Sequence, residues 1–198
     1  MYARFMQALA RRAGIRVFRF YSSRTDLRTA ETPLAEDVEL RPMEEHDMLA
    51  LCSQPSLDLD AGKVSDAYAR GDVCLAAFEQ GEAVGYCWLA FAPLPHLDGV
   101  WVDFDQHAAW LYKSFVVTAH RGRGIAAALY RFAERCWRAK SREYALICME
   151  SHNLASISAA RSAGYRASGM GGYMFQSDRV YSWTSPRAKP AGVRFYLP

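Results

Sequence analysis

The chain has 198 residues, of which 51% are hydrophobic and 23% charged, and this predicts one folded domain, or one domain with a short extension. The net charge of +3 does not by itself indicate a nucleic-acid-binding protein, and we expect no nucleic-acid partner. No run approaches the ~20 apolar residues of a transmembrane helix, so no membrane-spanning segment is expected.

The cysteines are scattered and form no CxxC pair, and no histidine lies beside them at metal-ligand spacing; they are Cys52, Cys74, Cys87, Cys136 and Cys148. We therefore expect free thiols in a reducing compartment, a cytoplasmic location and no metal site.

The first 35 residues are predicted to form a basic N-terminal extension. Residues 2–13 have the pattern of an amphipathic helix, 15–21 alternate like a strand, and 22–35 read as a linker. Arginines, and no acidic residue, precede Asp26. The extension could pack on the domain, lie on an anionic membrane surface or contact a partner protein. Its strand could extend the sheet or pair with another subunit, so a homodimer is one hypothesis.

The rest of the chain divides into a domain at 36–184 and a tail at 185–198. In order, the patterns predict a strand at 38–41, helices at 44–51 and 57–70, strands at 73–78 and 83–92, a long connection at 93–107, a strand at 108–117, a helix at 124–138, a strand at 144–149, a helix at 153–164, and strands at 165–176 and 180–184. This order predicts an α/β (α+β) fold with a mostly antiparallel sheet and one crossover at 108–150.

The turn between the strand at 108–117 and the following helix carries the strongest chemical signal. It reads Arg121-Gly122-Arg123-Gly124-Ile125-Ala126. A helix N-terminus leaves backbone N–H groups unpaired, glycines let an anion approach, and arginines add charge, so the turn suits a diphosphate. The glycine spacing fits neither a P-loop nor a dinucleotide fold. A plain glycine turn with solvated arginines is the alternative.

Residues 36–184 resemble the GCN5-related N-acetyltransferase (GNAT) superfamily. Its glycine motif, Gln/Arg-x-x-Gly-x-Gly/Ala, is matched by Arg121, Gly124 and Ala126. Its second motif, an Asn after the next strand and a helix closing in Gly-aromatic, is matched by Asn153, Ser156, Gly164 and Tyr165.

The resemblance implies a twisted sheet with a V-shaped splay between the two central parallel strands. It also implies acetyl-coenzyme A, or another acyl-coenzyme A, as cosubstrate. The pantetheine arm would pair with the backbone of Phe115, Val116 and Val117, the diphosphate would contact the amides of 121–126, and Asn153 and Ser156 would face the other side of the arm.

The catalytic groups are less well indicated. Many family members carry a Tyr acid seven residues after the Asn, where this chain has Ala160, which leaves water, Tyr165 or Tyr173 as donors. For the base we favour Glu150 and His107, which stand near the ends of the two central strands. His152, Asp103 and Asp105, which lie close to them in the sequence, remain alternatives.

The predicted function is N-acyl transfer, in particular N-acetyl transfer, from acyl-coenzyme A to a small-molecule or N-terminal amine by direct attack. Two alternatives remain. Ala160 motivates a non-catalytic acyl-coenzyme A-binding module. The basic N-terminus motivates a long-chain acyltransferase that uses an acidic acyl carrier protein, as some members of the superfamily do.

Overall fold

The structure is a computed structural model, and it describes residues 14–24, 37–176 and 178–198. The helix predicted at 2–13 and most of the predicted linker lie outside these residues. Within the described ranges, no helix is long and apolar enough to cross a membrane.

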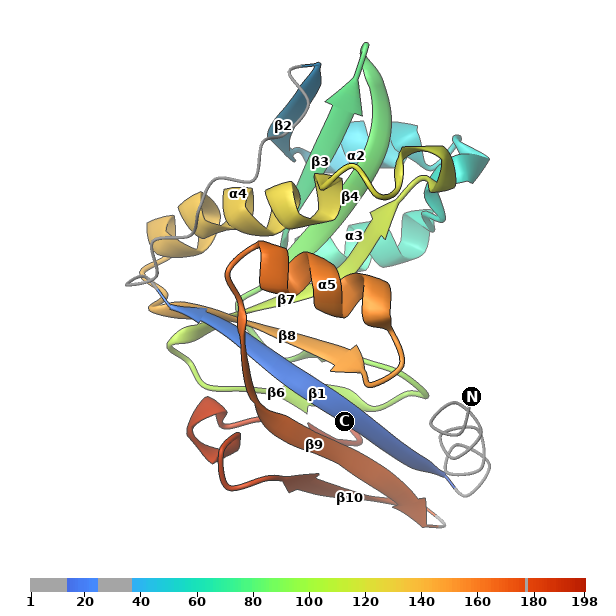
Figure 1. Ribbon diagram of the computed structural model, residues 1–198. Coiled ribbons are helices and arrows are strands. Elements are labelled where there is room, and N and C mark those ends of the chain that lie inside the picture. The colour runs from blue at the N-terminus through green and yellow to red at the C-terminus, as the bar shows by residue number, and fades with distance from the viewer. Residues whose placement is uncertain (1–13, 25–36, 177) are drawn as a thin grey trace.

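Eight strands form the main sheet, in the order β10-β9-β1-β8-β7-β4-β3-β2 (Figure 1). They are β1 (Ile15–Arg24), β2 (Val38–Met43), β3 (Val73–Glu79), β4 (Glu82–Ala90), β7 (Ala108–Val116), β8 (Tyr144–Glu150), β9 (Arg166–Gln176) and β10 (Arg179–Thr184). Among the described strand pairs, only β7 and β8 run parallel. This confirms the predicted fold class and the single crossover.

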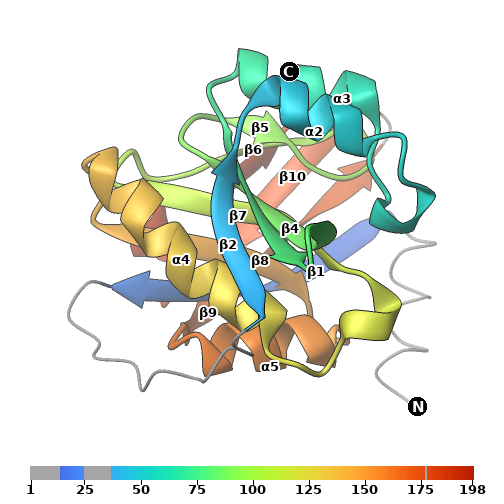
Figure 2. The ribbon, with the colours of Figure 1, turned by 90° about the horizontal axis from the view of Figure 1, so that it is seen from above.

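Helices cover both faces of the sheet. They are α2 (Glu45–Leu51), α3 (Ala61–Ala69), α4 (Ile125–Ala139) and α5 (Leu154–Ser162), with short 3-10 turns η1 (Pro55–Leu57), η2 (Thr118–His120) and η3 (Lys189–Ala191). Seen from above, α2 and α3 lie on one side of the sheet and α4 and α5 on the other (Figure 2). α4 buries the apolar stripe expected from its sequence, including Ile125, Leu129 and Trp137.

A second, small sheet covers the half of the main sheet that α2 and α3 leave open. It has the order β11-β6-β5 and consists of β5 (Leu94–Pro95), β6 (Trp101–Asp103) and β11 (Arg194–Tyr196). Residues 93–107 are predicted to be a connection and residues 185–198 a tail. Both are instead packed parts of the fold, because Val102 and Phe195 pair across β6 and β11 and are buried.

β1 is an inner strand of the main sheet. It pairs antiparallel with β8 on one side and with β9 on the other, and its Phe18 and Phe20 are buried. For this strand the sequence left two alternatives, that it extends the sheet or that it pairs with another subunit. β1 extends the main sheet, and because both of its edges are occupied within the chain it offers no edge to a second copy.

The two parallel strands separate toward their carboxyl ends. Ala108–Leu111 of β7 pairs with Tyr144–Ile147 of β8, whereas β7 continues to Val116 and β8 to Glu150. In the diverging part, Phe115 and Val116 pair outward with β4, and Glu150 pairs outward with β1. The fold therefore contains a V-shaped opening between two strands whose facing edges pair with no other strand among the described residues.

Candidate functional site

A pocket of about 850 Å³ lies where β7, the start of α4 and one side of α5 meet. Its walls are Ser114, Phe115, Val116, His120, Arg121, Gly122, Arg123, Gly124, Ile125, Ala126, Ala127, Tyr130, Asn153, Ala155, Ser156, Ser158, Ala159 and Ser162. All of the residues predicted to bind the cosubstrate therefore line it, except Val117. Val117 instead packs against the core under α2 and α3.

The N-terminus of α4 opens into this pocket. The first bond of the helix runs from the N–H of Ala128 to the carbonyl of Gly124, so the N–H groups of 124–127 have no acceptor within the helix. Gly122 and Gly124 both have φ of +79°, a conformation that strains any residue with a Cβ. The turn is thus shaped to present amides and the positive end of the helix dipole to an anion.

The two arginines of the turn have different partners. Arg121 donates from Nε to the carbonyl of Val116 at 3.0 Å, and its guanidinium lies 5.9 Å from the centre of the Phe115 ring. Arg123 forms a two-pronged ion pair with Glu79. This contact lowers the pKa of Glu79 to about 2. Both arginines line the pocket, but Arg121 is held to the end of β7, whereas the side chain of Arg123 is paired with Glu79 and ties the turn to β3.

Asn153 closes the other side of the pocket. Its side chain accepts a hydrogen bond from the N–H of Ser156 at 3.2 Å and caps α5. Asn153 therefore both caps the helix and lines the pocket, and Ser156 and Ser158 of the same helix also line it.

Two hydroxyl groups at the inner end of the pocket contact each other, and the sequence does not predict this contact. Ser114 Oγ of β7 and the phenol oxygen of Tyr130 on α4 are 2.6 Å apart. The helical period could have indicated Tyr130, because it lies one turn after Ala126. The side of β7 on which the Ser114 side chain lies depends on a β-bulge. Between the pairs Trp88–Tyr112 and Tyr86–Phe115, β7 has one residue more than β4. Only the structure reveals that irregularity, which coincides with a φ of +42° at Lys113.

The two residues predicted as bases lie at different ends of the parallel strands. Glu150 ends β8, at the open end of the V, near Arg16 at 3.9 Å and His152 at 3.5 Å. His107 precedes β7 at its closed end, where it contacts Glu143. At ~3.3 Å per residue, Phe115 is about 23 Å farther along β7 than its first residue. The structure therefore does not bring His107 to the pocket.

The tyrosines considered as proton donors do not line the pocket either. Ala160 is fully buried in the core under α4 and α5. Tyr165 is buried in the same core, and its hydroxyl has no hydrogen-bond partner among the described residues. Tyr173 lies on the opposite face of the sheet, with its hydroxyl 3.4 Å from a carboxylate oxygen of Asp98.

Comparison with known proteins identifies the class to which this fold and site belong. The sequence profile of the Acetyltransferase (GNAT) family matches residues 38–165. Because this match covers more than half of the chain, the chain belongs to the GNAT acetyltransferase family, whose general reaction is acyl transfer from acetyl-coenzyme A. No curated protein matches the sequence significantly.

Solved structures show the same fold at low sequence identity. A GCN5-related N-acetyltransferase from Sphaerobacter thermophilus superposes with a TM-score of 0.56 and 17% identity, over 82% of this chain and 53% of the other. A GNAT-family acetyltransferase from Colwellia psychrerythraea gives 0.54 and 16%, over 87% of this chain and 62% of the other. The chain thus spans about half to three fifths of the length of these two proteins.

Proposed function

We propose that the protein transfers an acyl group, in particular acetyl, from acyl-coenzyme A to a primary amine. One observation supports this proposal above the others: the free amides at the N-terminus of α4 open into a pocket that continues along the unpaired edge of β7. A diphosphate needs the first feature, and an extended amide-containing arm can pair with the second as an added strand would.

The residues are assigned to parts of the cosubstrate as follows. The amides of 122–126 and the guanidinium of Arg121 would hold the diphosphate. The backbone of Phe115 and Val116 would pair with the pantetheine arm, and Asn153 and Ser156 would form the opposite wall. The thioester would then lie near Ser114, where the bulge in β7 leaves backbone N–H groups irregularly spaced and able to polarise its carbonyl.

The amine would approach from the other face of the sheet. Glu150 is on that face, because residues alternate along β8 and its neighbour Cys148 packs with the core under the small sheet. A carboxylate at this position attracts an ammonium group and accepts its proton, directly or through water. The amine nitrogen then attacks the thioester carbon, the carbon–sulfur bond breaks, and the thiolate leaves with its electron pair.

The proposal is tested by coenzyme A binding and thiol release. We expect coenzyme A to raise the melting temperature of the full chain, and a panel of primary amines with acetyl-coenzyme A to include one that accelerates thiol release. Arg121→Glu replaces an attractive charge by a repulsive one at the diphosphate, so we expect it to weaken coenzyme A binding by about tenfold to a hundredfold.

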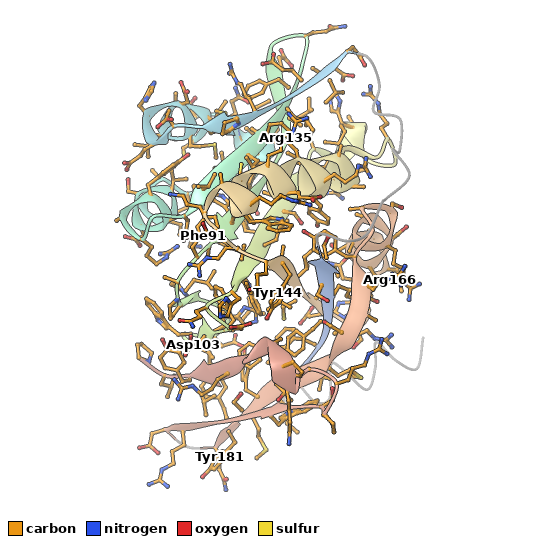
Figure 3. All side chains as sticks on the ribbon, turned by 90° about the vertical axis from the view of Figure 1, so that its left-hand side faces the viewer. Phe91, Asp103, Arg135, Tyr144, Arg166 and Tyr181 are labelled. Atoms are coloured by element: carbon orange, nitrogen blue, oxygen red, sulfur yellow. The ribbon has the colours of Figure 1, made fainter. Side chains whose placement is uncertain are left out.

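Arg135→Glu is the matched control for Arg121→Glu. Arg135 also lies over a phenylalanine ring, 5.4 Å from that of Phe132, but it is on the outer surface of α4 and does not line the pocket (Figure 3). The Arg135→Glu variant should bind coenzyme A as tightly as the unchanged protein does. Failure of coenzyme A to bind, or equal binding by Arg121→Glu, would reject the proposed cosubstrate site. Tight binding without thiol release from any amine would favour a non-catalytic binding module.

A further inference from the structure

We propose that Ser114 donates the proton that the departing thiolate needs, and that Tyr130 positions the Ser114 hydroxyl and reprotonates it. The inference rests on the proposed function and deepens it, because it assigns a proton donor to a chain that has Ala160 where many family members carry the tyrosine acid. It depends on the contact between these two side chains at the inner end of the pocket.

The position of the hydroxyl pair fits this role. Ser114 follows the bulge in β7, beside the opening between β7 and β8, and its side chain faces α4. Phe115 and Val116, the backbone proposed to pair with the pantetheine arm, come directly after it. A cosubstrate whose diphosphate is at Gly124 and whose arm follows this strand edge inward has its sulfur next to Ser114.

The order of the relay follows from burial. Tyr130 is 1% exposed, whereas Ser114 is partly exposed to the pocket. Ser114 is therefore the group that touches sulfur, and Tyr130 acts through it. The Tyr130 ring is fixed by an edge-on contact with Tyr165, with the ring centres 6.1 Å apart.

Tyr130 is in the protonation state that the role requires. Burial raises the pKa of Tyr130 to about 12, although the hydrogen bond with Ser114 lowers that pKa in part. The phenol is therefore protonated at neutral pH and can donate to Ser114 Oγ, which directs the serine proton into the pocket.

The proton balance of the step is complete. When the carbon–sulfur bond breaks, the sulfur keeps the electron pair and takes the proton of Ser114, which in turn takes that of Tyr130. The phenolate is reprotonated from solvent after the products leave. The ammonium loses two protons: Glu150 takes the first, directly or through water, before the attack, and the second leaves to water as the amide forms. The overall reaction therefore yields one amide, one thiol and one proton released to solvent.

Three conservative variants test the inference. Ser114→Ala and Tyr130→Phe should each lower kcat by about tenfold to a hundredfold, at the low end of the range for acid catalysis because a thiolate is already a fair leaving group. The Kd for coenzyme A should change by less than about threefold. Ser114→Thr keeps the hydroxyl and should retain most of kcat.

Tyr165→Phe is the matched control, because it keeps the ring that contacts Tyr130 and removes only a buried hydroxyl that lies outside the pocket and has no partner among the described residues. It should leave kcat unchanged. Thermal melting of each variant establishes that it is folded before its kinetics are compared.

A second readout needs no acceptor. A donor aimed at sulfur stabilises the thiolate of bound coenzyme A, so the ultraviolet absorbance of that thiolate should titrate about one pKa unit higher in Ser114→Ala and Tyr130→Phe than in the unchanged protein. The same titration should be unaltered in Tyr165→Phe.

The outcomes separate this inference from the function on which it rests. Folded variants with unchanged kcat and an unchanged thiol titration overturn the assignment of Ser114 and Tyr130 and leave the proposed function intact. Failure of the unchanged protein to bind coenzyme A overturns both.

Discussion

At the scale of single residues, side chains that look equivalent in the sequence have different surroundings in the fold. Arg121 and Arg123 are two positions apart and both line the pocket, yet Arg121 donates to the backbone of Val116 and Arg123 is paired with the carboxylate of Glu79. We therefore expect Arg123→Ala to affect coenzyme A binding less than Arg121→Ala does, because its guanidinium already has an anionic partner. Calorimetric Kd values for the two variants check this, and a greater loss in Arg123→Ala would contradict the assignment.

His96 is a residue whose burial predicts a pH dependence of stability. It lies among the rings of Phe18, Tyr173 and Phe195, and its Nε2 has no hydrogen-bond partner among the described residues. This burial lowers its pKa to about 4. The folded protein therefore keeps the ring neutral where the unfolded chain, with a pKa near ~6.5, takes up a proton.

The sign of the effect follows from this difference. Between pH ~6.5 and 4 the unfolded state binds more protons, so the free energy of unfolding falls as the pH falls, by roughly 2 to 3 kcal/mol from this residue. Urea unfolding at several pH values should show that decline, and His96→Phe should flatten it. His46→Gln, at a site 80% exposed, is the control and should retain the slope.

At the scale of secondary-structure elements, β1 has the largest structural consequence. It lies between β8, one arm of the V, and β9, and contributes Phe20 to the core beside Trp110. β8 pairs with β1 along its whole length, from Tyr144 to Glu150. The last residues of β8 therefore keep hydrogen-bond partners on the β1 side where they diverge from β7. The N-terminal strand thus supports the open arm of the candidate site.

Phe20→Ala tests this role of β1. Removing a fully buried ring should lower the free energy of unfolding by about 3–5 kcal/mol, measured by urea denaturation. Arg19→Ala changes the exposed neighbour on the same strand and should have an effect within about 0.5 kcal/mol. Equal, small effects of both variants would show that β1 is dispensable.

The sequence predicts elements where the pattern is local and fails where a partner is distant. The stripe of α4 and the hairpin between Phe78 and Ala83 are confirmed, since a helical period and a tight turn depend on neighbouring residues. The positions of β1 and β11 are not predictable in this way. Phe195 is buried because β11 pairs with the distant strand β6 and because its ring packs against Phe18 and Tyr173, and no local pattern specifies these contacts.

At the scale of the whole molecule, the sheet separates two kinds of chemistry. α4, α5 and the glycine turn at 121–126 lie on one face, and Glu150 and the small sheet lie on the other, with the V between them. The sequence predicts a common site for the glycine turn and Asn153 because motif spacing marks both, and the two line one pocket. The Ser114–Tyr130 contact could not, since it joins a bulged strand to a helix across the core.

A crystal structure of the full chain with bound coenzyme A would show where each part of the cosubstrate lies. We expect the diphosphate on the amides of 122–126, the arm along Phe115 and Val116, and the sulfur within hydrogen-bond distance of Ser114 Oγ. A diphosphate bound away from the N-terminus of α4, or an arm that leaves the edge of β7 unpaired, would contradict the proposed cosubstrate site.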